Sequence, residues 1–102
     1  ILEENYIEGN LVSENLFKYY NNGQIEYDRS YKNGLKDGKW TYWFQNGQLK
    51  EEGYYKDGKL DGIWTWWYDN GQKKSEKNYT DNKQEGKSSL WYDNGQFKEE
   101  GK

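Results

Sequence analysis

Short runs of alternating apolar and polar residues follow one another along the chain, and each run ends at a turn sequence. The clearest run is residues 40–44 (WTYWF), in which every second side chain is a large ring and which stops just before Asn46-Gly47. A period of two is that of a β-strand, whose successive side chains point to opposite faces. No stretch repeats at the 3.6-residue period of a helix, so we expect strands and turns throughout.

The same unit recurs every 24 residues. Asn-Gly-Gln occupies residues 22–24, 46–48, 70–72 and 94–96 without slippage. A fixed period of this length is the signature of stacked supersecondary units. We therefore expect residues 16–102 to hold four tandem repeats, the last of them partial. Residues 1–15 are predicted to be a degenerate N-terminal repeat or cap, since terminal repeats are commonly atypical.

Two turns per unit define its secondary structure. Asn-Gly between strand-like runs predicts a two-residue type I′ turn, in which both central residues have positive φ. A second reversal is predicted at Asn33-Gly34, Asp57-Gly58 and Asp81-Asn82. The result is an all-β fold, a single antiparallel meander of about eight short strands built from stacked hairpins.

The predicted turn also fixes which residues face each other. With Asn46-Gly47 as a two-residue turn, Phe44 lies opposite Leu49, Trp43 opposite Lys50, Tyr42 opposite Glu51 and Trp40 opposite Gly53. The face of Trp40, Tyr42 and Phe44 is the predicted core face, and it includes Leu49, its equivalents and the Tyr31, Tyr55, Tyr79 series. The equivalents of Leu49 are Ile25, Lys73 and Phe97. We expect the Trp40 ring to cover the bare backbone of Gly53.

The opposite face carries a large ring at the same place in every repeat, and a lysine is the predicted cross-strand partner of each tryptophan. These residues form the candidate binding surface: Tyr19, Trp43, Trp67, Trp91, Lys50, Lys74 and Lys98. One interpretation is a ladder of rings that binds a partner. The other is structural, since a ring can cover its face of a single-layer sheet by packing against a lysine stem.

Composition places most of the core in aromatic residues. A mean hydropathy of −1.52 with 32% charged residues would indicate disorder if the rings were ignored. The chain has eleven Tyr, six Trp and three Phe, and each ring can bury about 200 Å². The net charge is −3, with Lys and Glu interleaved rather than in blocks. We therefore expect no binding to nucleic acid.

Candidate catalytic chemistry is scarce. The chain has no His and no Cys, which excludes imidazole and thiolate metal ligands and the nucleophile systems that depend on them. The pairs Glu51-Glu52 and Glu99-Glu100 cannot converge on one ion or substrate, because neighbours on a strand point to opposite faces. The Gly residues do not cluster as a phosphate-binding loop. We expect no enzyme activity, no cofactor and no metal.

The compartment stays open at this level. The chain begins at Ile1 without an initiator Met, so we expect a trimmed or processed chain. No apolar run reaches the roughly 18 residues of a membrane span. We expect a bacterial protein that is cytoplasmic or, if an N-terminal signal was removed, secreted or in the cell envelope.

The positions that define one repeat unit are occupied by Gly38, Trp40, Asn46, Gly47, Gln48, Gly53, Tyr55, Gly58 and Gly62. This pattern resembles the MORN repeat, and more narrowly its bacterial variant with a Tyr/Trp-rich strand before Asn-Gly-Gln. The resemblance covers residues 16–102 well and residues 1–15 poorly. The sequence departs from it at Ser30 and Asn78, where Tyr54 stands in the best unit, and at Asn82 in place of Gly58. We expect a less even third unit.

The resemblance implies an elongated, twisted and curved row of hairpins that serves as a non-catalytic scaffold for protein binding. Bacterial proteins of the variant type are often labelled antitoxin-like or immunity-like partners of toxins. Some MORN proteins are proposed to contact membrane phospholipid, and other bacterial ones are surface or secreted proteins, so a module for membrane lipid, glycan or a host surface is the alternative. An open meander also exposes two edge strands, which makes an end-to-end homodimer a further expectation.

Overall fold

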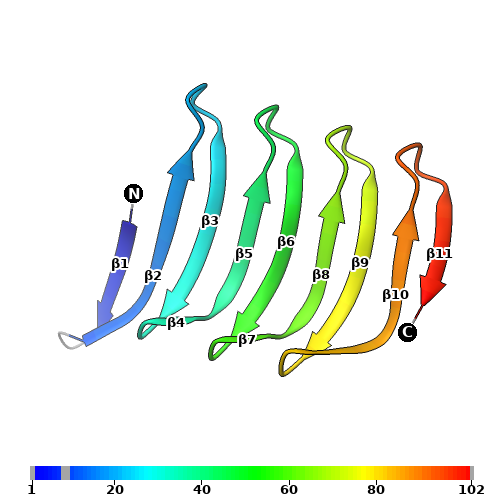
Figure 1. Cartoon of the computed structure of the whole chain (residues 1–102). Coiled ribbons are helices and arrows are strands. Elements are labelled where there is room, and N and C mark those ends of the chain that lie inside the picture. The colour runs from blue at the N-terminus through cyan, green and yellow to red at the C-terminus, as the bar shows by residue number, and fades with distance from the viewer. Residues whose placement is uncertain (1, 8–9, 102) are drawn as a thin grey trace.

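The computed structural model describes residues 2–7 and 10–101, which form one antiparallel sheet (Figure 1). Its strands in chain order are β1 Leu2–Ile7, β2 Asn10–Tyr19, β3 Ile25–Lys32, β4 Leu35–Lys36, β5 Gly38–Trp43, β6 Leu49–Lys56, β7 Lys59–Leu60, β8 Gly62–Trp67, β9 Lys73–Thr80, β10 Lys83–Trp91 and β11 Phe97–Gly101. The long strands are neighbours in sequence order, while β4 pairs only with β3 and β7 only with β6. The predicted all-β, open antiparallel meander is confirmed.

The sheet has eleven strands rather than about eight because residues 2–7 add β1 and because a glycine divides the segment after the second turn of two units. Gly38 and Gly62 have φ values of 95° and 92°, a left-handed conformation that glycine adopts without penalty. The chain bends at each of them, so a two-residue strand (β4 or β7) precedes the longer strand (β5 or β8). The described part of the chain contains no helix, and hence none able to cross a membrane.

The Asn-Gly-Gln loops are not the predicted type I′ turns. In the second unit the Gly47 amide donates to the Phe44 carbonyl at 3.0 Å, and the Phe44 amide donates to the Gln48 carbonyl at 2.8 Å. Gly47 has positive φ (88°) and Asn46 does not. This geometry is a three-residue loop, a type I turn followed by a left-handed glycine. The prediction was wrong because both turn types favour Asn and Gly here.

Type I′ turns occur at the second reversal. Asn33 and Gly34 both have positive φ (49° and 82°), as do Asp57 and Gly58 (49° and 85°). Lys32 pairs with Leu35 directly across the first of these turns. Asp81 and Asn82 keep the same conformation in the third unit although Asn replaces Gly, because Asn tolerates the left-handed region better than most residues.

A β-bulge in each hairpin compensates for the three-residue loop. Trp43 pairs with Leu49 and Tyr42 pairs with Glu51, so Lys50 is the extra residue on β6. The loop shifts the register by one residue and the bulge shifts it back. The pairs Tyr42–Glu51 and Trp40–Gly53 are therefore as predicted, whereas the predicted pairs Phe44–Leu49 and Trp43–Lys50 are wrong.

The sheet is a single curved layer, with Cα extents of 50 × 36 × 13 Å. Among the described side chains, Trp40 and Trp64 are the buried apolar ones, each 4% exposed. The Trp40 ring lies between Tyr31 and Tyr55, with ring centroids 5.3 and 4.8 Å away. Trp64, not Trp40, covers Gly53, since a Cβ added to Gly53 would lie 1.9 Å from Trp64 Cδ2.

The Asn of each loop joins its hairpin to the next one. Its Oδ1 accepts a hydrogen bond from the backbone N–H of the Gln two residues later. In the second unit this bond runs from the Gln48 backbone N–H to Asn46 Oδ1 at 2.9 Å. Its Nδ2 donates to a carbonyl 23 residues on, in the following hairpin. These donor–acceptor pairs are Asn22–Gln45, Asn46–Asp69 and Asn70–Asp93, at 2.9, 2.8 and 2.6 Å.

The N-terminal residues form a hairpin with the first repeat. β1 pairs with β2, and β2 continues across the predicted boundary between residues 15 and 16. The assignment of residues 1–15 to a degenerate repeat or cap stays a prediction. The side chains of residues 1–12 lie outside the described set, as does that of Glu99.

Candidate functional site

Large side chains lie in a row across one face of the sheet. In each hairpin the residue that ends the first strand pairs with the residue that begins the second, and directly opposed residues share a face. We call this row the tryptophan stripe, and its members are Tyr19, Ile25, Trp43, Leu49, Trp67, Lys73, Trp91 and Phe97. Ile25, Leu49, Lys73 and Phe97 thus lie on this face and not on the predicted core face.

The stripe is partly exposed along its length. Tyr19 and Phe97 at its ends are 49% and 54% exposed, and the three tryptophans are half-buried. Trp91 contacts Phe97 edge to face, with ring centroids 5.8 Å apart, and the Lys73 Nζ lies 5.6 Å from the Trp91 centroid. A groove of about 390 Å³ runs between Trp67 and Trp91 beside the loops.

The lysines of the candidate surface are on the other face. Lys50 is the bulge residue of its hairpin, and its Nζ lies 5.7 Å from the centroid of Phe44 rather than beside Trp43. Lys74 and Lys98 occupy the same place over Tyr68 and Tyr92, at 5.8 and 5.6 Å. The bulge therefore separates the seven candidate residues into a row of rings on one face and a row of lysines on the other.

The second face combines packed rings with cations, and we call it the cationic aromatic face. Its rings include Tyr27, Tyr31, Trp40, Tyr42, Tyr55, Trp64, Trp66 and Tyr79. The Arg29 guanidinium lies 3.9 Å from the Tyr27 centroid, and its Nε donates to the Tyr42 hydroxyl at 3.1 Å. This hydrogen bond raises the pKa of Arg29 against the opposing effect of burial.

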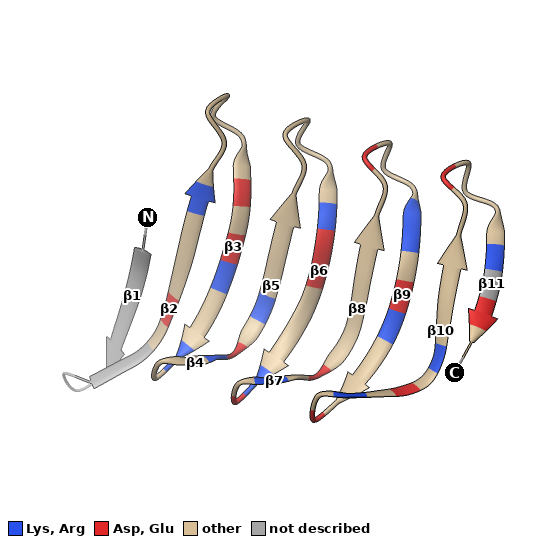
Figure 2. Ribbon diagram, viewed as in Figure 1, with Lys and Arg blue, Asp and Glu red and all other residues tan. Residues whose placement is uncertain are grey.

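Three lysines of the stripe face are held in ion pairs. Lys39 pairs with Glu52 at 3.2 Å, Lys73 with Glu76 at 3.0 Å and Lys87 with Glu100 at 3.5 Å. On the cationic aromatic face Lys18 pairs with Glu26 at 3.8 Å. Its other cations have no ion pair among residues 13–98 and 100–101, and they are Arg29, Lys36, Lys50, Lys74, Lys77 and Lys98. Figure 2 shows the charges gathered on β3, β6 and β9, while β8 has none.

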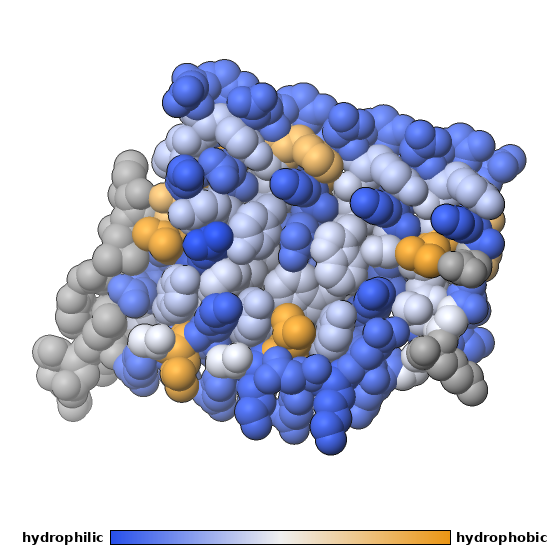
Figure 3. Space-filling model, viewed as in Figure 1, coloured by the Kyte–Doolittle hydropathy of each residue, from blue (hydrophilic) through white to orange (hydrophobic). Residues whose placement is uncertain are grey.

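A pocket of about 240 Å³ opens in the cationic aromatic face. Its lining comes from β5, β6, β7, β8 and β9, and consists of Tyr42, Glu51, Tyr55, Leu60, Trp64, Trp66 and Tyr79. Burial raises the pKa of Glu51, and the Lys50 charge and a hydrogen bond from Trp66 oppose that rise. In the space-filling view, pale side chains lie in the middle of the sheet with hydrophilic ones among them, and the upper and lower edges are mostly hydrophilic (Figure 3).

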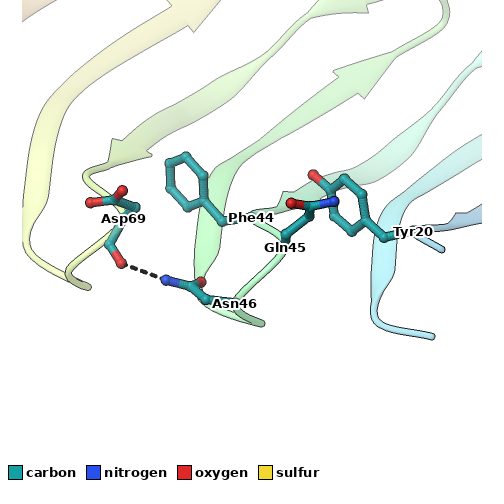
Figure 4. Close-up of a pocket in the computed structure, with 5 residues that line it drawn as sticks. All are labelled: Tyr20, Phe44, Gln45, Asn46 and Asp69. Atoms are coloured by element: carbon teal, nitrogen blue, oxygen red, sulfur yellow. Dashed lines mark hydrogen bonds between the residues drawn. The ribbon is translucent and has the colours of Figure 1, made fainter. Parts of the chain in front are cut away.

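A hollow of about 440 Å³ lies at the loop edge between consecutive hairpins, lined by Tyr20, Phe44, Gln45, Asn46 and Asp69. Figure 4 shows the Asn46 amide directed at the Asp69 backbone carbonyl, with the Phe44 ring beside this bond. The Tyr20 hydroxyl donates to the Trp43 carbonyl at 2.6 Å. These groups join repeats, so we assign the hollow a structural role.

The paired carboxylates of the described residues point to opposite faces of the sheet. Glu51 lines the pocket on one face, while Glu52 pairs with Lys39 on the other. Within the described ranges no group of three or more Asp or Glu residues is placed to hold a metal ion.

The sequence did not lead us to predict the pocket, or the position of Lys50, Lys74 and Lys98 on the cationic aromatic face. The available signal was the unevenness of the repeats at one position: Arg29, Gly53 and Lys77 are 24 residues apart, and only Gly53 lacks a side chain.

A family of known repeats matches most of this architecture. The family described as MORN repeat variant matches residues 15–33, 36–57 and 60–81, which together make up more than half of the chain. The three matches follow one another in phase with the hairpins. No curated protein and no solved structure matches the chain significantly.

Proposed function

We propose that this chain, which belongs to the family of MORN repeat variants, is a scaffold that binds a protein partner through its tryptophan stripe. MORN repeats are commonly non-catalytic modules in binding, and the family is a non-catalytic repeat type. The proposal adds a surface to this general role. Its residues are Tyr19, Trp43, Trp67 and Trp91 of the predicted set, without the three lysines.

The observation that supports the proposal is the position of the stripe on a single-layer sheet. One large side chain from each of eight successive long strands, β2 to β11, lies in this row, and no second layer of the described chain covers it. Tyr and Trp are the residues that most often dominate protein interfaces. Lys73 interrupts the row, and its charge is paired with Glu76 at 3.0 Å.

A finer version makes the partner a toxin that this chain holds inactive, as an immunity-like or antitoxin-like protein. What supports this version is the thin, extended shape, which offers a face large enough for an interface of about 800 Å² per side. The alternative is that the stripe contacts membrane lipid or glycan. Half-exposed rings suit either surface, but anionic lipid would also require basic residues beside them, and Lys73, the lysine within the stripe, is paired with Glu76.

The experiment compares the wild type with the double variant Trp43→Thr, Trp67→Thr. The partner is identified by co-purification from the native source at a fixed ratio, and its affinity for each variant is then measured by calorimetry. We expect the double variant to remain folded by circular dichroism and to bind at least tenfold more weakly. Tyr54→Thr is the matched control, because Tyr54 is 42% exposed on the same face but outside the stripe.

An unfolded double variant would show that the tryptophans are structural, and unchanged affinity would place the interface elsewhere. Co-sedimentation of the wild type with vesicles of anionic lipid at low salt, absent in the double variant, would favour the lipid alternative.

A further inference from the structure

The pocket in the cationic aromatic face exists in the second repeat because two residues differ from the first. Going back 24 residues, Gly53 corresponds to Arg29 and Leu60 corresponds to Lys36. The rings around the two places are equivalent, since Trp40 and Tyr42 correspond to Trp64 and Trp66. The first and second repeats therefore place different side chains at the same site among equivalent rings.

In the first repeat a cation of the chain itself occupies the space. The Arg29 guanidinium lies 3.9 Å from the Tyr27 centroid and 5.5 Å from the Tyr42 centroid. The Lys36 Nζ lies 5.0 Å from the Trp40 centroid. The Tyr42 hydroxyl accepts a hydrogen bond from Arg29, and aromatic rings pack against both cations.

In the second repeat no cationic side chain occupies the equivalent place. Gly53 has no side chain, and the Trp64 ring lies directly on its backbone. Leu60 replaces a cation with an apolar wall. What is left is the pocket of about 240 Å³, lined mainly by rings and containing one carboxyl group, that of Glu51. A pocket of this size and lining suits one large apolar side chain.

The surroundings of the pocket are positively charged. The Lys36 Nζ lies 5.0 Å from the Tyr55 centroid on one side, and the Lys77 Nζ lies 5.9 Å from the Trp66 centroid on the other. Lys74 lines a neighbouring hollow with Trp66 and Lys77. None of these three lysines has an ion pair among residues 13–98 and 100–101, so their charges are available to a ligand.

We propose that this pocket binds a large apolar side chain, such as Phe or Leu, presented by an acidic segment of a partner protein. The apolar side chain enters between Tyr42, Tyr55 and Trp66, and the flanking carboxylates reach the surrounding lysines. Complementary charge orients such a segment and excludes basic ones. A phosphate backbone is a poorer fit, because Glu26 and Glu51 lie on the same face and the net charge is −3.

This site goes beyond the proposed function, since it lies on the face opposite the tryptophan stripe. The two can fail independently. A partner that binds through the stripe alone would leave the proposed function intact, and the variants below leave every stripe residue unchanged.

The test uses fluorescein-labelled peptides of about twelve residues and measures their binding by fluorescence anisotropy at low salt. The first peptide carries one central Phe between runs of Glu. The second replaces Phe with Ala, and the third replaces every Glu with Lys. We expect the first to bind measurably, the second at least tenfold more weakly and the third not at all. Raising the salt concentration should weaken the binding of the first peptide.

Two variants test the pocket and its charges. Leu60→Lys installs the residue that the first repeat has at the equivalent place, Lys36, so the fold should tolerate it. We expect it to weaken binding of the first peptide at least tenfold. Its matched control is Leu35→Lys, which copies Lys59 into the first repeat at an exposed site. Lys77→Glu should also weaken binding, whereas Lys56→Glu, the same change on the stripe face, should not.

Four results would overturn the proposal. One is equal binding of the first peptide to the wild type and to Leu60→Lys. Another is binding of the Lys-flanked peptide as tight as that of the Glu-flanked one. The third is displacement of the first peptide by a single-stranded oligonucleotide at lower concentration than by unlabelled peptide, which would assign the face to nucleic acid. Failure of every peptide to bind a folded wild-type protein at millimolar concentration would likewise reject it.

Discussion

The indole of Trp64 lies flat on the backbone of Gly53, so that a Cβ at position 53 would be 1.9 Å from Trp64 Cδ2. The two residues come from adjacent strands of different repeats, β8 and β6. The Trp64 Nε1 donates to the Tyr54 carbonyl at 3.1 Å, which holds the ring in this position. The buried Trp64 ring thus joins its own repeat to the preceding repeat, which contains Gly53.

Gly53→Ala should therefore lower the free energy of unfolding by about 2–3 kcal/mol, because the new methyl group must push the Trp64 ring away from its packed site. The measurement is urea denaturation followed by tryptophan fluorescence. Gly101→Ala is the matched control, since residue 101 occupies the equivalent place and its added Cβ meets only Ser88 Oγ at 3.5 Å. Similar losses at both positions would refute this explanation.

The loop asparagines should contribute through their bond to the next hairpin. Asn46→Asp keeps an acceptor for the Gln48 amide but removes the donor to the Asp69 carbonyl. We expect a loss of about 0.5–1 kcal/mol in unfolding free energy. Asn94→Asp is the control, because the Asn94 Nδ2 reaches only its own Gln96 Oε1 at 3.5 Å. An equal loss in the control would show that the turn, not the inter-repeat bond, is responsible.

Phe44→Tyr should stabilise the protein. The residues 24 before and after it are Tyr20 and Tyr68, whose hydroxyls donate to the carbonyls of Trp43 and Trp91 at 2.6 and 2.8 Å. A hydroxyl on Phe44 would reach the equivalent Trp67 carbonyl and add about 0.5–1.5 kcal/mol. Thermal unfolding is the measurement, with Tyr68→Phe as the reverse change. Lower stability of Phe44→Tyr would show that the site cannot accept the oxygen.

Glu51 should make stability depend on pH. Burial raises its pKa in the folded protein above the ordinary value of 4.5, so folding favours the protonated form. The cost of burying the charge is present at pH values above the folded pKa and disappears as the pH falls below 4.5. Glu51→Gln should therefore be more stable than the wild type at pH 7, with the difference shrinking toward pH 4. A carboxyl pKa of 4.5 or lower for Glu51, measured by NMR titration, would contradict this.

Self-association through the sheet edges stays a prediction. β1 and β11 are the two outermost strands of the described sheet, and each has a single strand neighbour (Figure 1). Unpaired backbone groups on such edges can join a second copy. Light scattering over a range of concentrations should show a dimer, and a monomer at high concentration would disprove it.

The 24-residue period and its turn residues were enough to predict the antiparallel meander, the two reversals per unit and the face of Trp40 and Tyr42. These features depend on local rules, since glycine and asparagine mark reversals and strand residues alternate between faces. The pairs Tyr42–Glu51 and Trp40–Gly53 were predicted correctly for a further reason. The three-residue loop and the bulge change the register by one residue each, in opposite directions, and so leave no trace beyond Lys50.

Only the tertiary structure decided the positions of the lysines and the contacts between repeats. The turn type depends on which residues adopt positive φ, and Asn46-Gly47 is compatible with either type until the flanking strands are paired. The bulge at Lys50 then places its side chain over Phe44, away from Trp43. Likewise Trp40 and Trp64 both lie beside Gly53, and the choice of Trp64 depends on how each ring packs against the neighbouring strand, an arrangement that no local pattern encodes.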